Sequence, residues 1–304
     1  MDYQAILDSI MAEIQPWIGQ GKVADYIPAL GRVSPNKFGM ALATVDGDEY
    51  VAGDGDERFS IQSISKVFTL TLAINQADDD LWQRCGREPS GNPFNSLVQL
   101  EYEHGIPRNP LINAGALVTL DCIISARTDA KAALLSFARN HSGSPDIDFD
   151  EEVAKSEQAW GFRNAAMANF LKSQNNLEND VAAVLDSYFH QCALAMSCRE
   201  LARSLLYLAN EGIHPMSGET VVSARQARRI NSLMLTCGLY DAVGNFAYRV
   251  GLPGKSGVGG GIVVVVPKRL CLCVWSPGLD PAGNSLAGTQ ALELFAAKSG
   301  HSIF

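Results

Sequence analysis

The sequence predicts an α+β fold in which strands from both ends of the chain form one antiparallel sheet, with an all-helical lobe inserted between them. Strand-like segments joined by short turns lie near each end, and most of residues 66–249 show the helical spacing of apolar residues. A hydrophobic content of 47% with 19% charged residues is typical of a globular protein with a large core. We therefore expect a single domain over residues 1–304, with an α/β lobe from about 1–66 and 250–304 and a helical lobe of about 67–249.

The first predicted element is an amphipathic helix over residues 5–18. Its apolar residues recur at helical spacing, as at Ile6, Ile10 and Ile14. A glycine-rich break at 19–21 follows this segment. We expect this helix to cover one face of the sheet.

Two hairpins are predicted, one toward each end of the chain. Segments 38–44 and 50–52 are rich in strand-forming residues and flank Asp46-Gly47, a dipeptide that favours tight hairpin turns. Segments 261–266 and 270–275 flank a short polar turn in the same way. The simplest packing joins the two hairpins into one sheet.

The region between the hairpins contains seven candidate helices. Ser197 and Glu200 have the spacing of a capping box at the start of one of them. A last helix is expected over 286–298, on the same face of the sheet as the first. A cleft between the two lobes would suit a small ligand. The seven candidates span residues 67–74, 114–125, 130–140, 164–172, 181–196, 198–210 and 224–235.

Charge and hydropathy argue against several classes of partner. The net charge of −9 and the pI of about 5.1 give no support for nucleic-acid binding. The longest apolar stretch, 257–267, is shorter than the roughly 18 residues of a membrane span. The N-terminus lacks a basic segment followed by an apolar one, so we expect no signal peptide and no membrane partner.

The seven cysteines are read either as metal ligands or as reduced core thiols. No Cys-x-x-Cys pair occurs, and Cys271 and Cys273 have no histidine or cysteine partner at ligand spacing. Free cysteines are commonly buried, so we favour core thiols. This interpretation predicts no metal site and a reducing compartment, the cytoplasm.

A Ser-x-x-Lys motif at Ser63 and Lys66 is the first candidate for catalysis. It stands where the terminal hairpin region passes into the first helix of the inserted lobe. On a helical turn these two side chains share one face, so the amine can relay the proton of the serine, which is a weak nucleophile by itself. The alternative is that Ser63 only caps the helix.

A second motif, Lys255-Ser256-Gly257, opens a glycine-rich strand segment. It matches the Lys-Thr-Gly element of serine β-lactamases and penicillin-binding proteins. Glycines inside a strand often mark the close approach of a ligand or of another backbone. The alternative is a glycine-rich turn before a buried strand, but the occurrence of both motifs in this order favours a catalytic site.

The five histidines, at 104, 141, 190, 214 and 301, are scattered along the chain. A Ser-His-Asp triad is possible in principle, but no nucleophile-elbow Gly-x-Ser-x-Gly accompanies them as a strand, turn and helix. We therefore do not expect a histidine base.

These motifs resemble the bacterial glutaminases, which have the serine β-lactamase fold. The resemblance covers nearly the whole chain and implies a β-lactamase-like architecture. It also implies L-glutamine as the substrate, no metal or organic cofactor, and assembly into a homo-oligomer, either a tetramer or a dimer. The segments that carry it are 24–28, 59–66, 93–96, 110–116, 251–261, 276–277 and 283–285.

The resemblance implies the catalytic roles. Ser63 would be the nucleophile, Lys66 its activating partner and Tyr240 a phenol that shares in proton transfer. The backbone N–H groups of Ser63 and Val258 would form the oxyanion hole. Without the family, Tyr240 would be read as a surface tyrosine after a glycine turn.

The same resemblance implies the substrate contacts. Glu157 would bind the α-ammonium group of glutamine, and Asn113, Asn164 and Tyr188 would supply hydrogen bonds to its α-carboxylate. Tyr26 is expected as a pocket lid or a pocket contact, with a core aromatic as the alternative. By sequence alone Glu157 would be read as part of a solvated helix face, and the two asparagines as helix caps.

Two rival functions follow from the same motifs. The first is a penicillin-interacting peptidase or β-lactamase, which would work outside the cytoplasm and carry a signal or anchor segment. The second is a non-catalytic glutamine-binding protein, which would have no need to keep Ser63, Lys66 and Tyr240.

Overall fold

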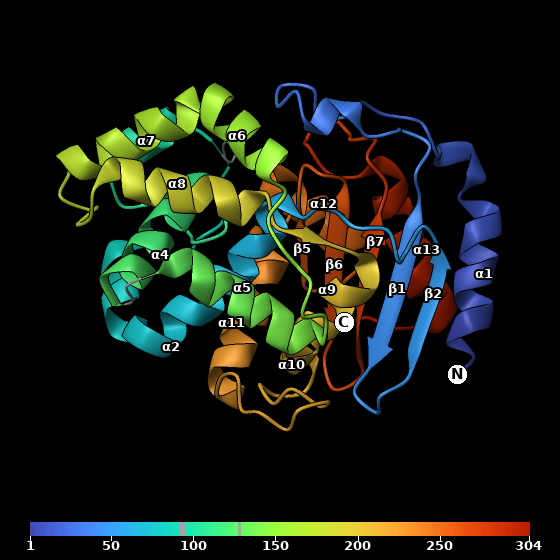
Figure 1. Ribbon diagram of the computed structural model, residues 1–304. Coiled ribbons are helices and arrows are strands. Elements are labelled where there is room, and N and C mark those ends of the chain that lie inside the picture. The colour runs from blue at the N-terminus through green and yellow to red at the C-terminus, as the bar shows by residue number, and fades with distance from the viewer. Residues whose placement is uncertain (92–94, 127–128) are drawn as a thin grey trace.

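The computed structural model describes residues 1–91, 95–126 and 129–304 as a two-layered body with a lobe of helices beside it (Figure 1). The side chains of residues 77–79 are not described. Pro93 and Phe94, which belong to the 93–96 motif, lie outside the described residues.

A five-stranded antiparallel sheet joins the two ends of the chain, in the order β2-β1-β7-β6-β5. Strand β7 is central, so that Val274 is paired with Met40 on one side and with Ile262 on the other. Both predicted hairpins and the α+β class are confirmed. The strands are β1 (Gly39–Thr44), β2 (Glu49–Gly53), β5 (Gly254–Ser256), β6 (Gly261–Val266) and β7 (Leu270–Trp275).

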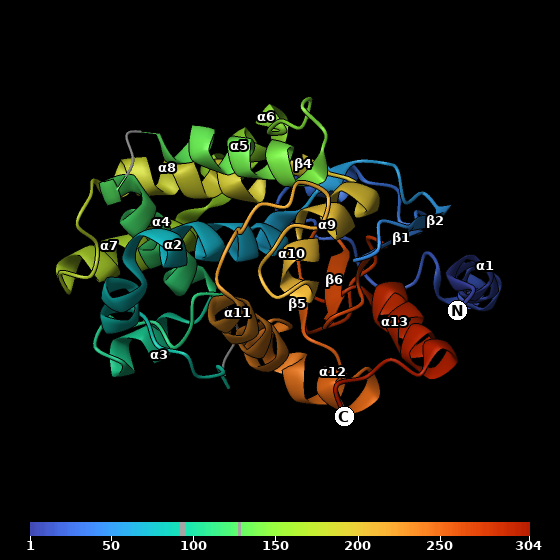
Figure 2. The ribbon, with the colours of Figure 1, turned by 90° about the horizontal axis from the view of Figure 1, so that it is seen from below.

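One face of the sheet is covered by the first and last helices, as predicted. Helices α1 (Tyr3–Glu13) and α13 (Leu286–Ser299) lie on the side of the sheet away from the helical lobe (Figure 2). Leu7 and Phe295 of these helices belong to one apolar cluster with Leu42 of β1. Because every residue of β1, β6 and β7 is buried, both faces of the sheet must be covered.

Truncating this cluster tests its contribution to stability. Phe295 is fully buried, so Phe295→Ala leaves a cavity and is expected to lower the free energy of unfolding by about 3–5 kcal/mol. Phe304→Ala is the matched control, because that ring is 85% exposed. Urea unfolding measures both variants, and a loss below about 1 kcal/mol for Phe295→Ala would show that this face does not hold the sheet.

The opposite face of the sheet packs against the helical lobe. Ala41, Val263 and Cys273 on this face belong to the large apolar cluster that runs into the lobe. Within residues 1–91, 95–126 and 129–304, none of the helices has the length and apolar character needed to span a bilayer. The remaining helices are α2 (Lys66–Arg84), α3 (Leu97–Tyr102), α4 (Asn113–Ala126), α5 (Ala130–Ser142), α6 (Glu151–Trp160), α7 (Phe162–Ser173), α8 (Val181–Cys192), α9 (Cys198–Ser204), α10 (Leu206–Ala209), α11 (Ala224–Cys237) and α12 (Val243–Arg249).

Four predicted helices differ in extent from the observed ones. The helix expected over 67–74 continues to Arg84 as α2. The helix expected over 5–18 ends at Glu13, because Pro16 cannot continue an α-helix, and the 3-10 turn Gln15–Trp17 follows. The segment 181–196 is helical only to Cys192, and Ala195–Met196 forms strand β4, which pairs with β3 (Phe59–Ser60).

The fourth incorrect prediction is the helix over 198–210. It is broken at Leu205, whose φ of −103° and ψ of 4° are not helical, into α9 and α10. The capping box of Ser197 and Glu200 at the start of α9 is confirmed. Helix α6 was not predicted at all.

Candidate active site

Ser63 lies in a tight turn between the sheet region and the helical lobe. Strand β3 leads into the 3-10 turn Gln62–Ser65, and helix α2 begins at the next residue. Gln62 has a positive φ of 50°, an uncommon conformation for a residue other than glycine. Such backbone strain is concentrated at functional sites, and here it orients the serine that follows.

Lys66 is the direct partner of Ser63. Its Nζ donates to the Ser63 Oγ at 2.6 Å and to the Asn113 Oδ1 at 2.8 Å. The Lys66 side chain is fully buried, and burial lowers its pKa to about 8. An amine with this pKa can lose its proton near neutral pH and then accept the proton of the serine hydroxyl.

The glycine-rich segment after β5 lies directly against the Ser63 turn. A β-carbon on Gly257 would stand 2.4 Å from the Ile61 carbonyl oxygen, and one on Gly259 would stand 2.1 Å from the Ser60 carbonyl oxygen. Only glycine permits this approach. The backbone of Val258, between the two glycines, is thereby held beside Ser63.

We expect Gly259→Ala to disable the site while the sheet stays folded. The new methyl group must displace the Ser60 carbonyl, and a shift of about 1 Å at a reacting group can cost about 10²-fold in rate. Gly244→Ala on α12 is the control, because its β-carbon would meet nothing within 4 Å. Steady-state turnover measures both, and unchanged kcat in Gly259→Ala would contradict the close approach.

Tyr240 is a further neighbour of Ser63 and packs in one apolar cluster with Val258. It opens the 3-10 turn Tyr240–Ala242 with a positive φ of 56°. Burial raises the pKa of its phenol to about 12, and hydrogen bonding with Ser63 and Ser256 opposes this rise. A phenol with this pKa stays protonated at neutral pH and can therefore donate a proton.

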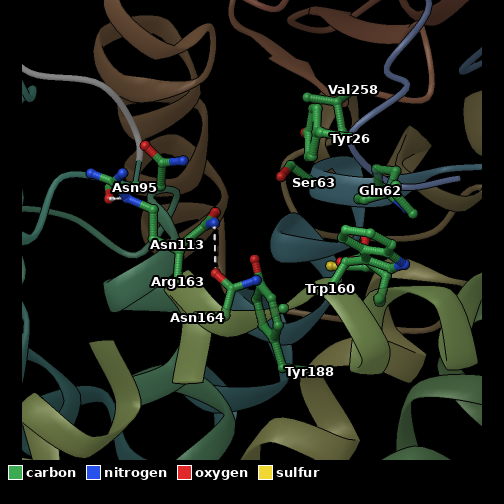
Figure 3. Close-up of a pocket in the computed structure, with 14 residues that line it drawn as sticks. Tyr26, Gln62, Ser63, Asn95, Asn113, Trp160, Arg163, Asn164, Tyr188 and Val258 are labelled. Atoms are coloured by element: carbon green, nitrogen blue, oxygen red, sulfur yellow. Dashed lines mark hydrogen bonds between the residues drawn. The ribbon is translucent and has the colours of Figure 1, made fainter. Parts of the chain in front are cut away.

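A cavity of about 200 Å³ opens at Ser63 (Figure 3). Lys66 and Tyr240 do not line it and are linked to it through Ser63. Figure 3 shows Val258 and Ser63 on one side of the cavity and Asn113 and Asn164 on the other. The residues expected from the sequence that line it are Tyr26, Ser63, Asn113, Glu157, Asn164, Tyr188 and Val258.

Glu157 supplies a buried carboxylate. It comes from α6, has 4% of its surface exposed, and burial raises its pKa to about 7, whereas a hydrogen bond with Gln62 and the charge of Lys66 lower it. A desolvated carboxylate is stabilised by a bound cation. The part of the cavity beside Glu157 therefore suits an ammonium group.

The two asparagines are ordered by a chain of hydrogen bonds. Asn113 accepts from Lys66 with its Oδ1 and donates from its Nδ2 to the Asn164 Oδ1 at 3.0 Å. This orientation leaves the amide NH₂ of Asn164 as a donor. Tyr188 on α8 is buried beside them, with the Lys66 Nζ 5.8 Å from the centre of its ring. The cavity thus offers hydrogen-bond donors as well as a carboxylate.

Comparison with known proteins decides the family. The glutaminase family model matches residues 21–304. The chain belongs to the glutaminase family. It is 58% identical over 305 residues to a glutaminase of Agrobacterium fabrum, an alignment that covers 100% of this chain and 99% of the relative.

Solved glutaminase structures share the fold. A probable glutaminase, ybaS, superposes with a TM-score of 0.94 at 37% identity, covering 99% of this chain and 97% of that one. A probable glutaminase from Bacillus subtilis, in complex with 6-diazo-5-oxo-L-norleucine, superposes with a TM-score of 0.90 at 33% identity, covering 100% of this chain and 97% of that one.

Sequence reasoning missed part of this glutaminase cavity. Gln62 and Arg163 each adjoin a predicted residue, and Cys192 follows Tyr188 by one helical turn, so local spacing alone offered a signal. Cys192 was expected only as a core thiol. Trp160 follows Glu157 by three residues on α6, so the same kind of spacing applied to it, whereas Asn95 reaches the cavity through tertiary packing. The residues missed are Ile27, Gln62, Asn95, Trp160, Gly161, Arg163 and Cys192.

Metal ligands and a histidine base are not features of this site. Among the described side chains, which exclude residues 77–79, 92–94 and 127–128, no cluster of three or more His, Cys, Asp or Glu is arranged to hold a metal ion. None of the described residues that line the cavity is a histidine.

Proposed function

We propose that this chain hydrolyses the side-chain amide of L-glutamine to L-glutamate and ammonia through an acyl-enzyme on Ser63. The observation that carries the proposal is the 2.6 Å contact between the Lys66 Nζ and the Ser63 Oγ, at the wall of a cavity that also holds a buried carboxylate. Glutaminase relatives at more than half identity over the whole chain support the substrate.

The α-ammonium and α-carboxylate groups of glutamine fit the part of the cavity that is lined by Glu157, Asn164 and Tyr188. The α-ammonium group pairs with Glu157, whose buried carboxylate gains the cation that it lacks. The α-carboxylate accepts hydrogen bonds from the amide NH₂ of Asn164 and from the Tyr188 hydroxyl, while Asn113 fixes the orientation of Asn164. The side-chain amide then extends toward Ser63.

Acylation proceeds by proton transfer and nucleophilic attack. Neutral Lys66 accepts the Ser63 proton while the Oγ attacks the carboxamide carbon. The tetrahedral oxyanion accepts hydrogen bonds from the N–H groups of Ser63 and Val258. Tyr240 protonates the nitrogen, the C–N bond breaks, and ammonia leaves the γ-glutamyl ester.

Deacylation repeats the chemistry with water. Lys66 is already protonated after acylation, so water gives a proton to the Tyr240 phenolate while the water oxygen adds to the ester carbonyl carbon. The collapse of the second tetrahedral species breaks the ester C–O bond, returns a proton to the Ser63 oxygen and releases L-glutamate. Side chains of this one chain supply every acid, base and nucleophile in this cycle.

Ammonia release from glutamine and from asparagine tests the substrate. Asparagine has one methylene fewer, so a ligand anchored at Glu157 cannot bring its amide carbon to the Ser63 Oγ. We expect kcat/KM for asparagine to be lower by about 10²-fold or more. Equal values for both amides would refute the anchoring at Glu157.

The pH dependence of kcat/KM follows from two pKa values. Lys66, with a pKa of about 8, must be neutral to accept a proton. Glu157, with a pKa of about 7, must be ionised to bind the ammonium group. Both requirements are met as pH rises, so kcat/KM should rise from about pH 6, pass through its steepest change near pH 7 to 8 and level off above about pH 9. A profile that falls as pH rises through 7 would contradict these assignments.

Three organisational expectations belong to the same proposal. The chain works as one domain, because its cavity draws on both lobes. It resides in the cytoplasm, in keeping with seven buried cysteines that are all unpaired. It forms a tetramer or a dimer of identical chains. The molar mass measured by light scattering, as the protein elutes from a size-exclusion column, would distinguish the two.

A further inference from the structure

Lys255 is a second buried lysine, and the mechanism above does not use it. It does not line the cavity, and its side chain is fully buried. Its Nζ donates to the Gly238 carbonyl at 3.0 Å and to the Ser256 carbonyl at 2.6 Å. The same Nζ lies 4.7 Å from the centre of the Tyr240 ring. Burying an amine is costly, so these contacts require an explanation.

The Gly238 carbonyl oxygen accepts three hydrogen bonds. Besides the Lys255 Nζ, it accepts the backbone N–H of Ser256 at 3.1 Å and the Ser256 hydroxyl at 3.4 Å. Gly238 precedes Tyr240 by two residues. Strand β5 therefore fixes the start of the turn that carries Tyr240.

A second contact holds the next peptide group from another part of the chain. Asn284, in the loop before α13, donates its Nδ2 to the Leu239 carbonyl at 3.4 Å. The neighbouring Gly283 packs on the phenol, since a β-carbon there would stand 3.6 Å from the Tyr240 Cε2. Both peptide groups before Tyr240 are thus held, one by Lys255 and one by Asn284.

The contacts of Lys255 and Asn284 together form a clamp on the Tyr240 turn. The turn needs this clamp because its backbone is strained. The left-handed φ of 56° at Tyr240 is unfavourable for a residue other than glycine. It persists only where the surroundings fix it. Relaxation of this turn would move the phenol away from Ser63.

We propose that Lys255 is a positioning residue that acts through Tyr240, holding the Gly238 carbonyl and the phenol ring so that the hydroxyl faces Ser63, with Asn284 as its counterpart. This inference rests on the proposed role of Tyr240 in proton transfer. One side chain reaches the turn at two points, since the Lys255 Nζ both donates to the Gly238 carbonyl and lies 4.7 Å from the centre of the Tyr240 ring.

A double-mutant cycle tests the coupling. Lys255→Met keeps the length of the side chain and removes its donors, and we expect it to lower kcat for glutamine by about 30-fold. In a Tyr240→Phe background, Lys255→Met should lower kcat by less than about 3-fold, because the Tyr240 hydroxyl through which Lys255 acts is absent. The dissociation constant of glutamate should stay within about 2-fold, since Lys255 does not line the cavity.

Distinct outcomes separate the possible failures. Equal losses from Lys255→Met in both backgrounds, or weakened glutamate binding, would overturn the positioning role. If Tyr240→Phe alone kept full turnover, the proposed role of Tyr240 would fail instead. Lys268→Met, on an exposed turn, is the matched control and should leave kcat unchanged.

Asn284→Ala provides a second variant that leaves no altered lysine in the core. Asn284→Ala should lower kcat by about 5-fold in the parent enzyme and by less than about 2-fold in the Tyr240→Phe background. If Lys255→Met fails to fold, equal losses from Asn284→Ala in both backgrounds would overturn the clamp by themselves.

Discussion

Replacement of Ser63 by alanine is expected to lower kcat by about 10⁴-fold or more, because it removes the only atom that forms the acyl-enzyme. The change deletes one oxygen and keeps the backbone N–H of the oxyanion hole. The cavity loses little of its lining, so the dissociation constant of glutamine should change by less than about 3-fold. Ammonia release measures turnover, and calorimetry of the inactive variant measures binding.

The matched control is Ser9→Ala on helix α1, which replaces a partly exposed serine on the face of the sheet away from the cavity. It should retain full activity. Turnover in Ser63→Ala at a substantial fraction of the parent rate would mean that another group attacks the amide.

Glu157→Gln is expected to raise KM for glutamine by about 10²- to 10³-fold with a smaller effect on kcat, because loss of one partner of a buried charge pair costs about 2–5 kcal/mol. Glutamine at this position keeps the size and one acceptor oxygen but not the charge. The amide also brings N–H donors toward the substrate ammonium group. KM and kcat should be measured at about pH 8, where the parent carboxylate is ionised.

Two comparisons isolate the charge. Glu151→Gln, in the exposed first turn of the same helix, should leave KM unchanged. Glutaramate, which is glutamine without the α-ammonium group, should be used by the parent and by Glu157→Gln with similar kcat/KM. If Glu157→Gln weakened glutamine and glutaramate equally, the carboxylate would not be the ammonium site.

The fold was predictable where signals are local. The Asp46-Gly47 turn and the run of β-branched residues in 261–266 identify their strands without tertiary information. Helix α6 was not, because its burial is confined to a few residues such as Val153 and Ala154, which pack against Ile27 from a distant segment. Apolar residues are sparse in this segment, so the sequence alone gives a weak signal for a packed helix.

The residues of the site likewise divide into those with a local sequence signal and those that only tertiary contacts bring together. Ser63 and Lys66 are three residues apart, so helical geometry alone brings them together. Glu157 and Tyr188 meet across separate helices, and only the resemblance to glutaminases indicated them. The link between Lys255 and the carbonyl of Gly238 depends on packing of β5 against the Tyr240 turn, which no spacing in the sequence encodes.

Covalent labelling identifies the nucleophile most directly. 6-Diazo-5-oxo-L-norleucine, the compound bound in the Bacillus subtilis structure, places an electrophilic carbon where the glutamine amide would lie. Cys192 also lines the cavity, but burial raises the pKa of its thiol to about 12, so it should stay unreactive. Peptide mapping by mass spectrometry should find one adduct, on Ser63, that glutamate suppresses. An adduct on Cys192, or labelling that persists unchanged in Ser63→Ala, would contradict the acyl-enzyme mechanism.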